Sequence, residues 1–331
     1  MISSLYTSLY FQLLLDSFVL LGRYYTSLYF CQAYIGYIFV FHADVVYNVR
    51  MARRDNYKGP LFIVAASVCW SFGGLCIKFI PWGALTINGL RAFFAAIVFG
   101  LYRRSARVRL TKGNIIAAIC LCATTNMFVL ANKLTTAAAA ILLQYCMPVF
   151  IVLIELFFYK KKPRLVEIAA VLATLLGMTL FFGDRLEAGA MLGNLLAVAS
   201  GLAFAGVFVC NSRPDVDPEH SLFLGFIINS AIGLPFAIFD VTPDPLAWTA
   251  VIFLGSVQVG VAYIFFTTGI KSTSALLAGL ISALEPVLNP VWVALFTGEV
   301  PGPFATIGGG IILLTVISYN IWAERASRAA T

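Results

Sequence analysis

The polar side chains with the clearest chemical potential lie inside long apolar runs. Glu285 lies near the middle of the stretch 273–297, with Ser282 and Asn289 three residues before and four residues after it. Such spacings place side chains on one helical face. A lone carboxylate at the centre of a bilayer costs about 2.5–3.5 kcal/mol on insertion scales, so Glu285 is expected to face protein or water. Burial favours the neutral form, which fits either a proton carrier or a structural, hydrogen-bonded carboxyl.

A second charged side chain, Arg91, falls inside the apolar stretch 84–102. It lies roughly 10 Å along the helix predicted there, at a rise of about 1.5 Å per residue. Three roles fit this depth: binding a substrate carboxylate, pairing with Glu285, or extending the guanidinium to the membrane interface. The sequence does not choose among them.

Two prolines, Pro148 and Pro286, interrupt two apolar stretches at corresponding positions. Proline removes the hydrogen bond from residue i to residue i−4, so the carbonyl groups of Gln144 and Ser282 lose their usual partners. Paired interruptions of this kind are typical of a transporter's binding site. The alternative is a kink that serves packing alone, with neighbouring helices supplying the missing partners.

Other polar and aromatic residues also lie near the middle of apolar stretches. Each has an alternative role as a hydrogen-bonding residue between helices, worth about 0.6 kcal/mol on average. Except for Thr124 and Thr125, these mid-span residues are assigned to the predicted substrate site. Arg91, Glu285, Ser282, Asn289, Pro148 and Pro286 belong to the same predicted site. Such a site has a mixed polar and aromatic character, which suits amino acids or other amphipathic metabolites. The mid-span residues are Trp70, Ser71, Thr124, Thr125, Asn126, Gln144, Tyr145, Gln258 and Tyr263.

The composition excludes an ordinary soluble domain. Hydrophobic residues make up 61% of the 331 residues and charged residues 11%, against about 45–50% and about 25% in soluble domains. The net charge of +7 comes from short basic clusters between apolar runs, which argues against a nucleic-acid partner. The seven Cys match no zinc spacing, and the two His accompany no phosphate loop or nucleophile elbow. We therefore expect no enzyme, no metal and no cofactor.

From Met51 onward the sequence contains ten apolar segments, and a run of about 20 apolar residues makes one spanning helix. The loops are short, so consecutive helices are antiparallel neighbours. The fold class predicted is an all-α membrane protein with ten transmembrane helices. The segments are 60–79, 84–102, 114–131, 135–159, 165–183, 191–211, 221–240, 246–269, 273–297 and 304–323.

Basic residues collect in alternate loops, as in the cluster Lys160, Lys161, Lys162 and Arg164 after the fourth segment. The positive-inside rule assigns the side with these clusters to the cytoplasm. Both ends of the ten-helix unit are therefore expected to be cytoplasmic.

The chain contains an internal repeat. Residues 133–150 (KLTTAAAAILLQYCMPVF) align without gaps with residues 271–288 (KSTSALLAGLISALEPVL), and residues 59–76 align with residues 193–210. These matches indicate a duplicated five-helix unit, and an odd number of helices requires the two copies to lie inverted in the membrane. The loop 297–301 has no basic residue, unlike its counterpart after the fourth segment. Inverted repeats are typical of secondary transporters.

Residues 59–323 resemble the drug/metabolite transporter superfamily and, within it, the EamA-type ten-helix permeases. The tandem repeat carries this resemblance, with ANKLTTAAAAILLQYCMPVF at 131–150 and STSALLAGLISALEPVLNPVWVALFTGE at 272–299. It implies one EamA-like repeat over 59–183 and a second over 193–323. It also implies efflux or exchange of a small metabolite across the bacterial cytoplasmic (inner) membrane.

Residues 1–50 differ from the rest, because they are rich in Tyr and repeat YTSLYF at 6–11 and 25–30. We expect an upstream extension outside the functional fold, and the alternative is one or two further membrane spans. For the whole chain we expect a permease that moves a small organic metabolite by alternating access, with protons as a candidate coupling ion. The competing interpretation is a membrane receptor or scaffold that does not transport.

Overall fold

The computed structural model describes residues 59–73, 76–77, 80–135, 137–182, 191–288 and 303–328, and in these residues all regular structure is helical. The extension predicted at residues 1–50 and the site residue Asn289 lie outside the described residues.

The helices follow the predicted apolar segments. The ninth predicted segment contains, after a turn at Ala283, a further short helix over 284–288. The elements are α3 (Gly59–Trp70), α5 (Ala84–Arg103), α6 (Lys112–Leu134), α7 (Ala137–Gln144), α8 (Met147–Tyr159), α9 (Leu165–Phe182), α10 (Met191–Asn211), α11 (Pro218–Asp240), α12 (Pro245–Phe253), η2 (Leu254–Val261), α13 (Ala262–Ile270), α14 (Ala275–Ser282) and α16 (Pro303–Arg328).

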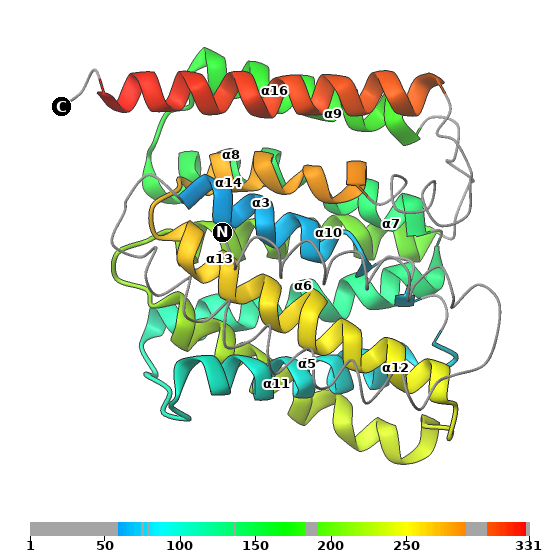
Figure 1. Ribbon diagram of the computed structural model, residues 1–331. Coiled ribbons are helices and arrows are strands. Elements are labelled where there is room, and N and C mark those ends of the chain that lie inside the picture. Colours follow the sequence, from blue (N-terminus) through cyan, green and yellow to red (C-terminus); the bar gives the residue numbers. More distant parts are fainter. Residues whose placement is uncertain are drawn as a thin grey trace, which may run out of the picture.

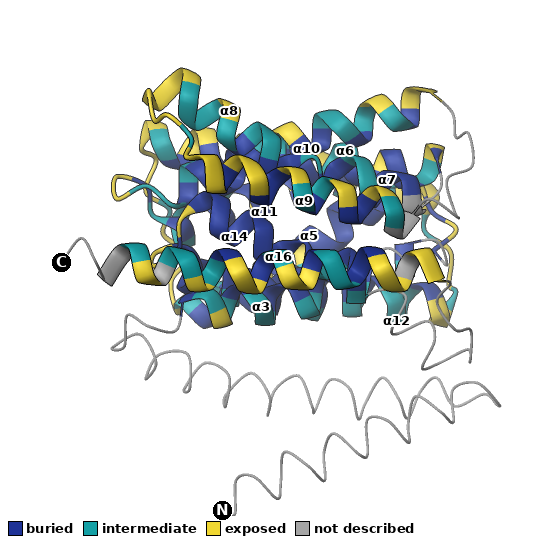
Figure 2. Ribbon diagram, turned by 90° about the horizontal axis from the view of Figure 1, so that it is seen from above, coloured by how far each residue is buried: buried dark blue, intermediate teal, exposed yellow. Residues whose placement is uncertain are grey.

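Seven helical stretches of the described chain are long and apolar enough to cross a membrane, and three shorter apolar helices accompany them. They correspond one for one to the ten predicted segments. Large apolar side chains are exposed on the outer faces; on α16, for example, Leu314 is 67% exposed (Figure 2). Lipid is the environment in which such a surface is stable. The all-α membrane fold predicted from the sequence is thus confirmed.

Short polar side chains fix where several helices begin. The Thr111 hydroxyl accepts a hydrogen bond from the Asn114 amide before α6, and the Asp217 carboxylate accepts one from the Glu219 amide before α11. Ser274 caps α14 in the same way. Each cap satisfies a backbone N–H that has no partner inside its helix.

The helices pack in pairs drawn from the two halves of the chain. In Figure 1, α9 and α16 run together along one edge, and α5 and α11 lie at the opposite edge. The α5–α11 contact is close at Gly89 and Gly233: a Cβ atom added to Gly89 would lie 2.5 Å from the Gly233 Cα. Only glycine fits at this crossing.

Two helices are broken at positions that the repeat alignment pairs. The fourth apolar segment divides into α7 and α8 at Tyr145 and Cys146, and the ninth is interrupted at Ala283. Pro148 lies in the first turn of α8, where its missing N–H costs no intrahelical hydrogen bond. At these breaks the amides of Cys146 and Ala283 donate to carbonyls three residues back, so corresponding helices of both repeats contain a tightened turn.

The eighth apolar segment contains a feature that the sequence did not predict, the π-helix η2 between α12 and α13. Gly255 in η2 packs on the backbone of α5, since an added Cβ atom would lie 2.6 Å from the Arg91 carbonyl oxygen. π-Helical turns are rare and occur frequently at functional sites.

Candidate functional site

One cavity is lined by side chains from both repeats. Its volume is about 40 Å³. Of the predicted site residues, it brings together Trp70, Arg91 and Gln144 from the first half and Gln258, Tyr263 and Glu285 from the second. The remaining lining residues are Thr124, Thr125, Phe128, Phe204 and Val259.

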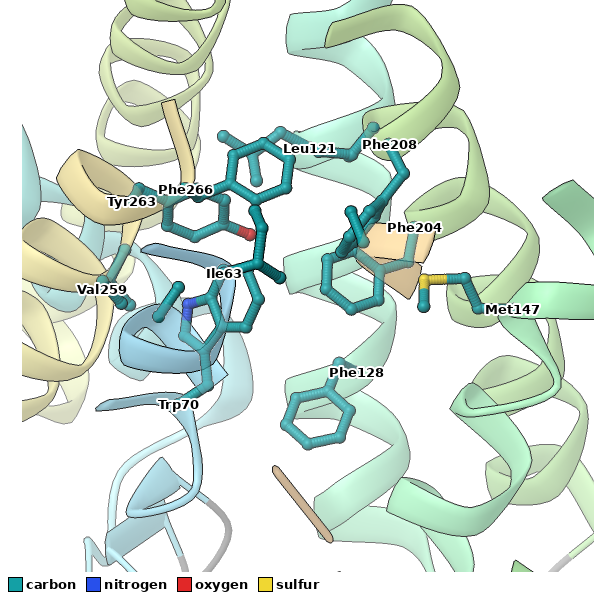
Figure 3. Packing of buried hydrophobic residues seen from close by; sticks show 14 of the residues in the cluster. Ile63, Trp70, Leu121, Phe128, Met147, Phe204, Phe208, Val259, Tyr263 and Phe266 are labelled. Atoms are coloured by element: carbon teal, nitrogen blue, oxygen red, sulfur yellow. The ribbon is translucent and has the colours of Figure 1, made fainter. Parts of the chain in front are cut away.

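Aromatic rings form one wall of this cavity. Trp70 lies edge-to-face against Tyr263 and Phe204, with ring centroids 5.1 and 5.9 Å away. Figure 3 shows these rings converging with Phe128 and Phe208. Edge-to-face pairs contribute about 0.5–1.5 kcal/mol beyond the area that they bury, so these ring contacts stabilise the wall.

Arg91 is the charged side chain at the α5 side of the cavity. Only 5% of its surface is exposed, and its Nη1 atom has no hydrogen-bond partner in the described part of the chain. Arg91 and Glu285 line the same cavity, yet the described residues form no ion pair between them within 4.0 Å. The cation therefore faces the cavity without a protein counter-ion in contact.

Glu285 follows the break in the ninth segment and is half-buried. The hydroxyl of Tyr145, which lies in the other break, donates a 2.6 Å hydrogen bond to Glu285 Oε2. The two interrupted helices are thus joined through a carboxyl group that also lines the cavity.

Gln144 marks the end of α7 beside the cavity. Its Nε2 donates to Ser200 Oγ at 2.7 Å, and Ser200 Oγ donates to the Thr124 carbonyl at 3.0 Å. The Gln144 carbonyl, one of those that a helix end leaves without an internal donor, faces Gly201; a Cβ atom there would lie 2.6 Å from this oxygen. Gly201 gives this carbonyl at the end of α7 the space that it needs.

Gln258 extends from the π-helix toward α3. Its Nε2 donates at 3.3 Å to the carbonyl of Trp70, one of the carbonyls that a helix end leaves without an internal donor. The Gln258 Oε1 atom is buried and has no hydrogen-bond partner among the described residues. The π-helix thus contributes to the cavity lining a side chain with a free acceptor.

Asn126 does not line the cavity but lies beside it in a buried cluster with Asn88, Thr125 and Asn229. Asn126 Nδ2 donates to Asn229 Oδ1 at 2.7 Å, and Asn88 Nδ2 donates to Asn126 Oδ1 at 2.9 Å. Asn229 Nδ2 donates to Thr125 Oγ1 at 2.9 Å. This cluster joins α5, α6 and α11, so the structure gives Asn126 a bridging position between helices.

The remaining described candidates are also set back from the cavity. The Ser71 hydroxyl donates to the Val68 carbonyl at 2.6 Å, and the Ser282 hydroxyl donates to the Ala278 carbonyl at 2.9 Å. Pro148 and Pro286 are buried at the helix breaks. These four residues shape the backbone around the site and are not part of its lining.

Several lining residues were absent from the predicted set. Thr124 and Thr125 were recognised as mid-span polar residues but were not assigned to the site. Phe128, Phe204 and Val259 had no distinguishing signal, because an apolar residue within an apolar run can face lipid, protein or a cavity.

Two successive stretches of the chain, residues 57–183 and 191–321, match the model of the EamA-like transporter family. The chain belongs to this family. The resemblance noted from the sequence is therefore confirmed, and so is an organisation in two EamA repeats. Membership identifies a membrane transporter, which supports transport over the alternative of a receptor or scaffold.

Individual relatives are similar at a lower level of identity. An uncharacterized transporter of Archaeoglobus fulgidus is 26% identical over 265 residues, which cover 78% of this chain and 95% of the relative. The aromatic amino acid exporter YddG of Ancylobacter novellus is 27% identical over 201 residues, covering 57% of this chain and 70% of the relative.

One solved crystal structure shares the fold. It superposes with a TM-score of 0.68 at 24% sequence identity, covering 81% of this chain and 98% of that chain. This likeness supports the helical architecture.

Proposed function

We propose that the protein is a secondary transporter that exports or exchanges a small organic metabolite, such as an amino acid or another amphipathic compound, by alternating access. The observation that carries this proposal is a cavity to which both repeats contribute polar and aromatic side chains. A site at the interface of two repeats is where transporters of inverted-repeat architecture bind their substrates. The similarity to a relative named as an aromatic amino acid exporter supports the same substrate class.

The size of the cavity implies a conformational change. A buried water needs roughly 10–15 Å³ of such volume, so the 40 Å³ present here holds only a few waters. Pockets for small organic ligands are usually roughly 300–1,000 Å³. The lining must therefore separate before a metabolite enters, and the breaks between α7 and α8 and after α14 are points at which such movement can occur.

We place the transporter in the bacterial cytoplasmic membrane with both ends of the ten-helix unit in the cytoplasm. The supporting observation is the exposed basic cluster Lys160, Lys161, Lys162 and Arg164 between α8 and α9. Basic residues in short loops favour the cytoplasmic side.

Glu285 is our candidate for coupling transport to protons. It lines the cavity and is hydrogen-bonded to Tyr145 of the other repeat. A carboxyl group at this place shares the cavity with the substrate, so protonation of Glu285 and binding of the substrate affect each other's free energy directly. A purely structural carboxyl, held by Tyr145, is the alternative.

The proposal is tested with the full chain reconstituted in liposomes. Labelled amino acids and other small organic molecules are loaded, and efflux and uptake are measured with and without a pH gradient, with protein-free liposomes as the control. Flux of one of these compounds above the control supports a transporter. Binding without flux, from protein shown to be folded, supports a receptor and overturns the proposal.

A further inference from the structure

Arg91 is a buried cation whose charge the described protein does not neutralise by direct contact. A guanidinium stays charged at neutral pH and carries five N–H donors. Arg91 is 5% exposed, and its Nη1 atom is buried without a hydrogen-bond partner among the described residues. Buried charges in proteins are normally paired, so this arrangement needs a reason.

Arg103, at the other end of α5, shows how this protein satisfies an arginine for structural purposes. Arg103 donates to the carbonyls of Ser105 and Arg107, lies 2.9 Å from the His220 ring nitrogen and stacks on Phe223 at 4.8 Å. Nothing comparable surrounds Arg91 in the part of the chain that the structure describes. The contrast indicates that the Arg91 donors are kept available.

The two other roles considered for Arg91 do not fit its position. Its low exposure argues against a guanidinium extended to the membrane interface. Pairing with Glu285 is absent within 4.0 Å in the described chain, and Glu285 Oε2 already accepts from Tyr145. With these two roles excluded, the remaining partner for Arg91 is an anion that enters the cavity.

We propose that Arg91 binds the carboxylate of the transported substrate, and that the substrate class is therefore small monocarboxylates with an aromatic or aliphatic body. This inference rests on the proposed transport function and assigns the chemistry of its binding site. Arginine holds a carboxylate through two parallel N–H to O hydrogen bonds, a geometry that a lone ammonium does not match. The rings of Trp70, Phe128 and Tyr263 in the same cavity supply the apolar surroundings for the rest of the molecule.

The π-helix η2 packs against the backbone of Arg91. Gly255 of η2 packs on the Arg91 backbone, where a Cβ atom would lie 2.6 Å from the carbonyl oxygen and 3.0 Å from Cα. The same π-helix carries Gln258, whose free Oε1 atom is an acceptor suited to an N–H or O–H group of the substrate. This backbone contact fixes the position of the Arg91 Cα atom and leaves the guanidinium free to bind a ligand.

The test measures binding of three matched probes to the full chain in lipid nanodiscs. Phenylalanine has a carboxylate and an amine, 3-phenylpropanoate has only the carboxylate, and 2-phenylethylamine has only the amine. We expect the two carboxylate probes to bind wild type, and Arg91→Gln to raise their Kd roughly 10- to 100-fold, the range for a lost hydrogen bond to a charged group. Arg91→Lys keeps the positive charge but cannot form the two parallel hydrogen bonds, so its Kd values are expected to lie between those of wild type and Arg91→Gln.

The controls separate a binding role from a folding role. Arg107→Gln removes one exposed positive charge from the loop after α5 and is expected to leave all three Kd values unchanged. Because Arg91 forms no ion pair within 4.0 Å in the described chain and its Nη1 atom makes no hydrogen bond there, Arg91→Gln is expected to unfold at a temperature at least as high as wild type. A large drop in its unfolding temperature, with equal weakening of all probes, would assign Arg91 a structural role and overturn the inference.

The remaining outcomes also decide the matter. Binding of 2-phenylethylamine to wild type as tightly as 3-phenylpropanoate, or the absence of binding by both carboxylate probes, overturns the inference. Flux of a solute without a carboxylate, unaffected by Arg91→Gln, overturns it while leaving the proposed transport function in place. Carboxylate binding that depends on Arg91, without flux of any solute, supports the inference and overturns transport.

Discussion

The Tyr145 hydroxyl donates a 2.6 Å hydrogen bond to Glu285 Oε2 and thereby joins the two broken helices of the opposite repeats. Each partner lies at or just after a break that the repeat alignment pairs, Tyr145 between α7 and α8 and Glu285 after Ala283. A bond between these points resists separation of the two helices, and the proposed transport requires such a separation for substrate entry. We therefore expect this bond to affect both stability and opening.

Tyr145→Phe removes this hydrogen bond and keeps the ring. A hydrogen bond contributes about 0.5–1.5 kcal/mol net, so we expect a fall in the unfolding temperature. In a Glu285→Leu background the same substitution is expected to have little further effect, because its partner is already absent. The double-mutant cycle measures the coupling directly, and additive effects of the two substitutions would show that the bond contributes nothing.

Glu285→Gln tests proton coupling, since glutamine keeps the shape and an acceptor for Tyr145 but carries no exchangeable carboxyl proton. We expect substrate exchange without a pH gradient to continue, and the stimulation of flux by a pH gradient to disappear. Transport assays in proteoliposomes at several internal and external pH values measure this. A variant that responds to the gradient as wild type does would assign Glu285 a structural role.

Gly89→Ala tests the crossing of α5 and α11. An added Cβ atom would lie 2.5 Å from the Gly233 Cα, and overpacking of this kind typically destabilises by about 1–3 kcal/mol. Gly310→Ala in α16 is the matched control, because nothing lies within 4 Å of its added Cβ atom. Thermal unfolding should show a loss for Gly89→Ala and a gain for Gly310→Ala, where alanine replaces glycine in a helix at no steric cost. Equal responses of the two variants would contradict the close crossing.

The sequence predicted the helices well because their signal is local. A run of apolar residues indicates burial in lipid independently of its tertiary neighbours. Pro148 and Pro286 likewise indicate a missing backbone N–H donor, however the helix packs. The π-helix η2 carries no such signal. Its wider turn accompanies contact between Gly255 and the Arg91 backbone, which depends on the tertiary arrangement.

The same distinction applies to the candidate site. Arg91, Glu285 and Gln258 were recognisable because a polar group within an apolar run needs a partner or a cavity. Ser282 looked equally promising, but its hydroxyl donates to the Ala278 carbonyl of its own helix, an alternative that a sequence pattern does not distinguish. Phe204 lines the cavity with no feature that separates it from the apolar residues that face lipid.

The two lysines that the repeat alignment pairs, Lys133 and Lys271, have different surroundings. Lys133 Nζ donates to the Ile80 carbonyl at 2.7 Å, whereas Lys271 Nζ lies 3.8 Å from Asp217 Oδ1. Lys271 and Asp217 also border a cavity of about 490 Å³. If the repeats are inverted, equivalent residues lie on opposite sides of the membrane, and we then expect the contact at Lys133 to hold its side closed more firmly than the contact at Lys271 holds the other side.

Lys133→Gln is expected to loosen the Lys133 side, since the shorter neutral side chain does not reach the Ile80 carbonyl. Cys76 is half-buried and precedes Ile80 by four residues in the chain. It should then react with a membrane-impermeant maleimide roughly tenfold faster, the factor for loss of a hydrogen bond from a charged group. Cys76→Ala identifies the signal, and Lys112→Gln, an exposed lysine at the far end of α6, is the charge-matched control. Equal labelling rates for Lys133→Gln and Lys112→Gln would show that the lysine contact does not close this side, and the difference between the two repeats would then have no part in alternating access.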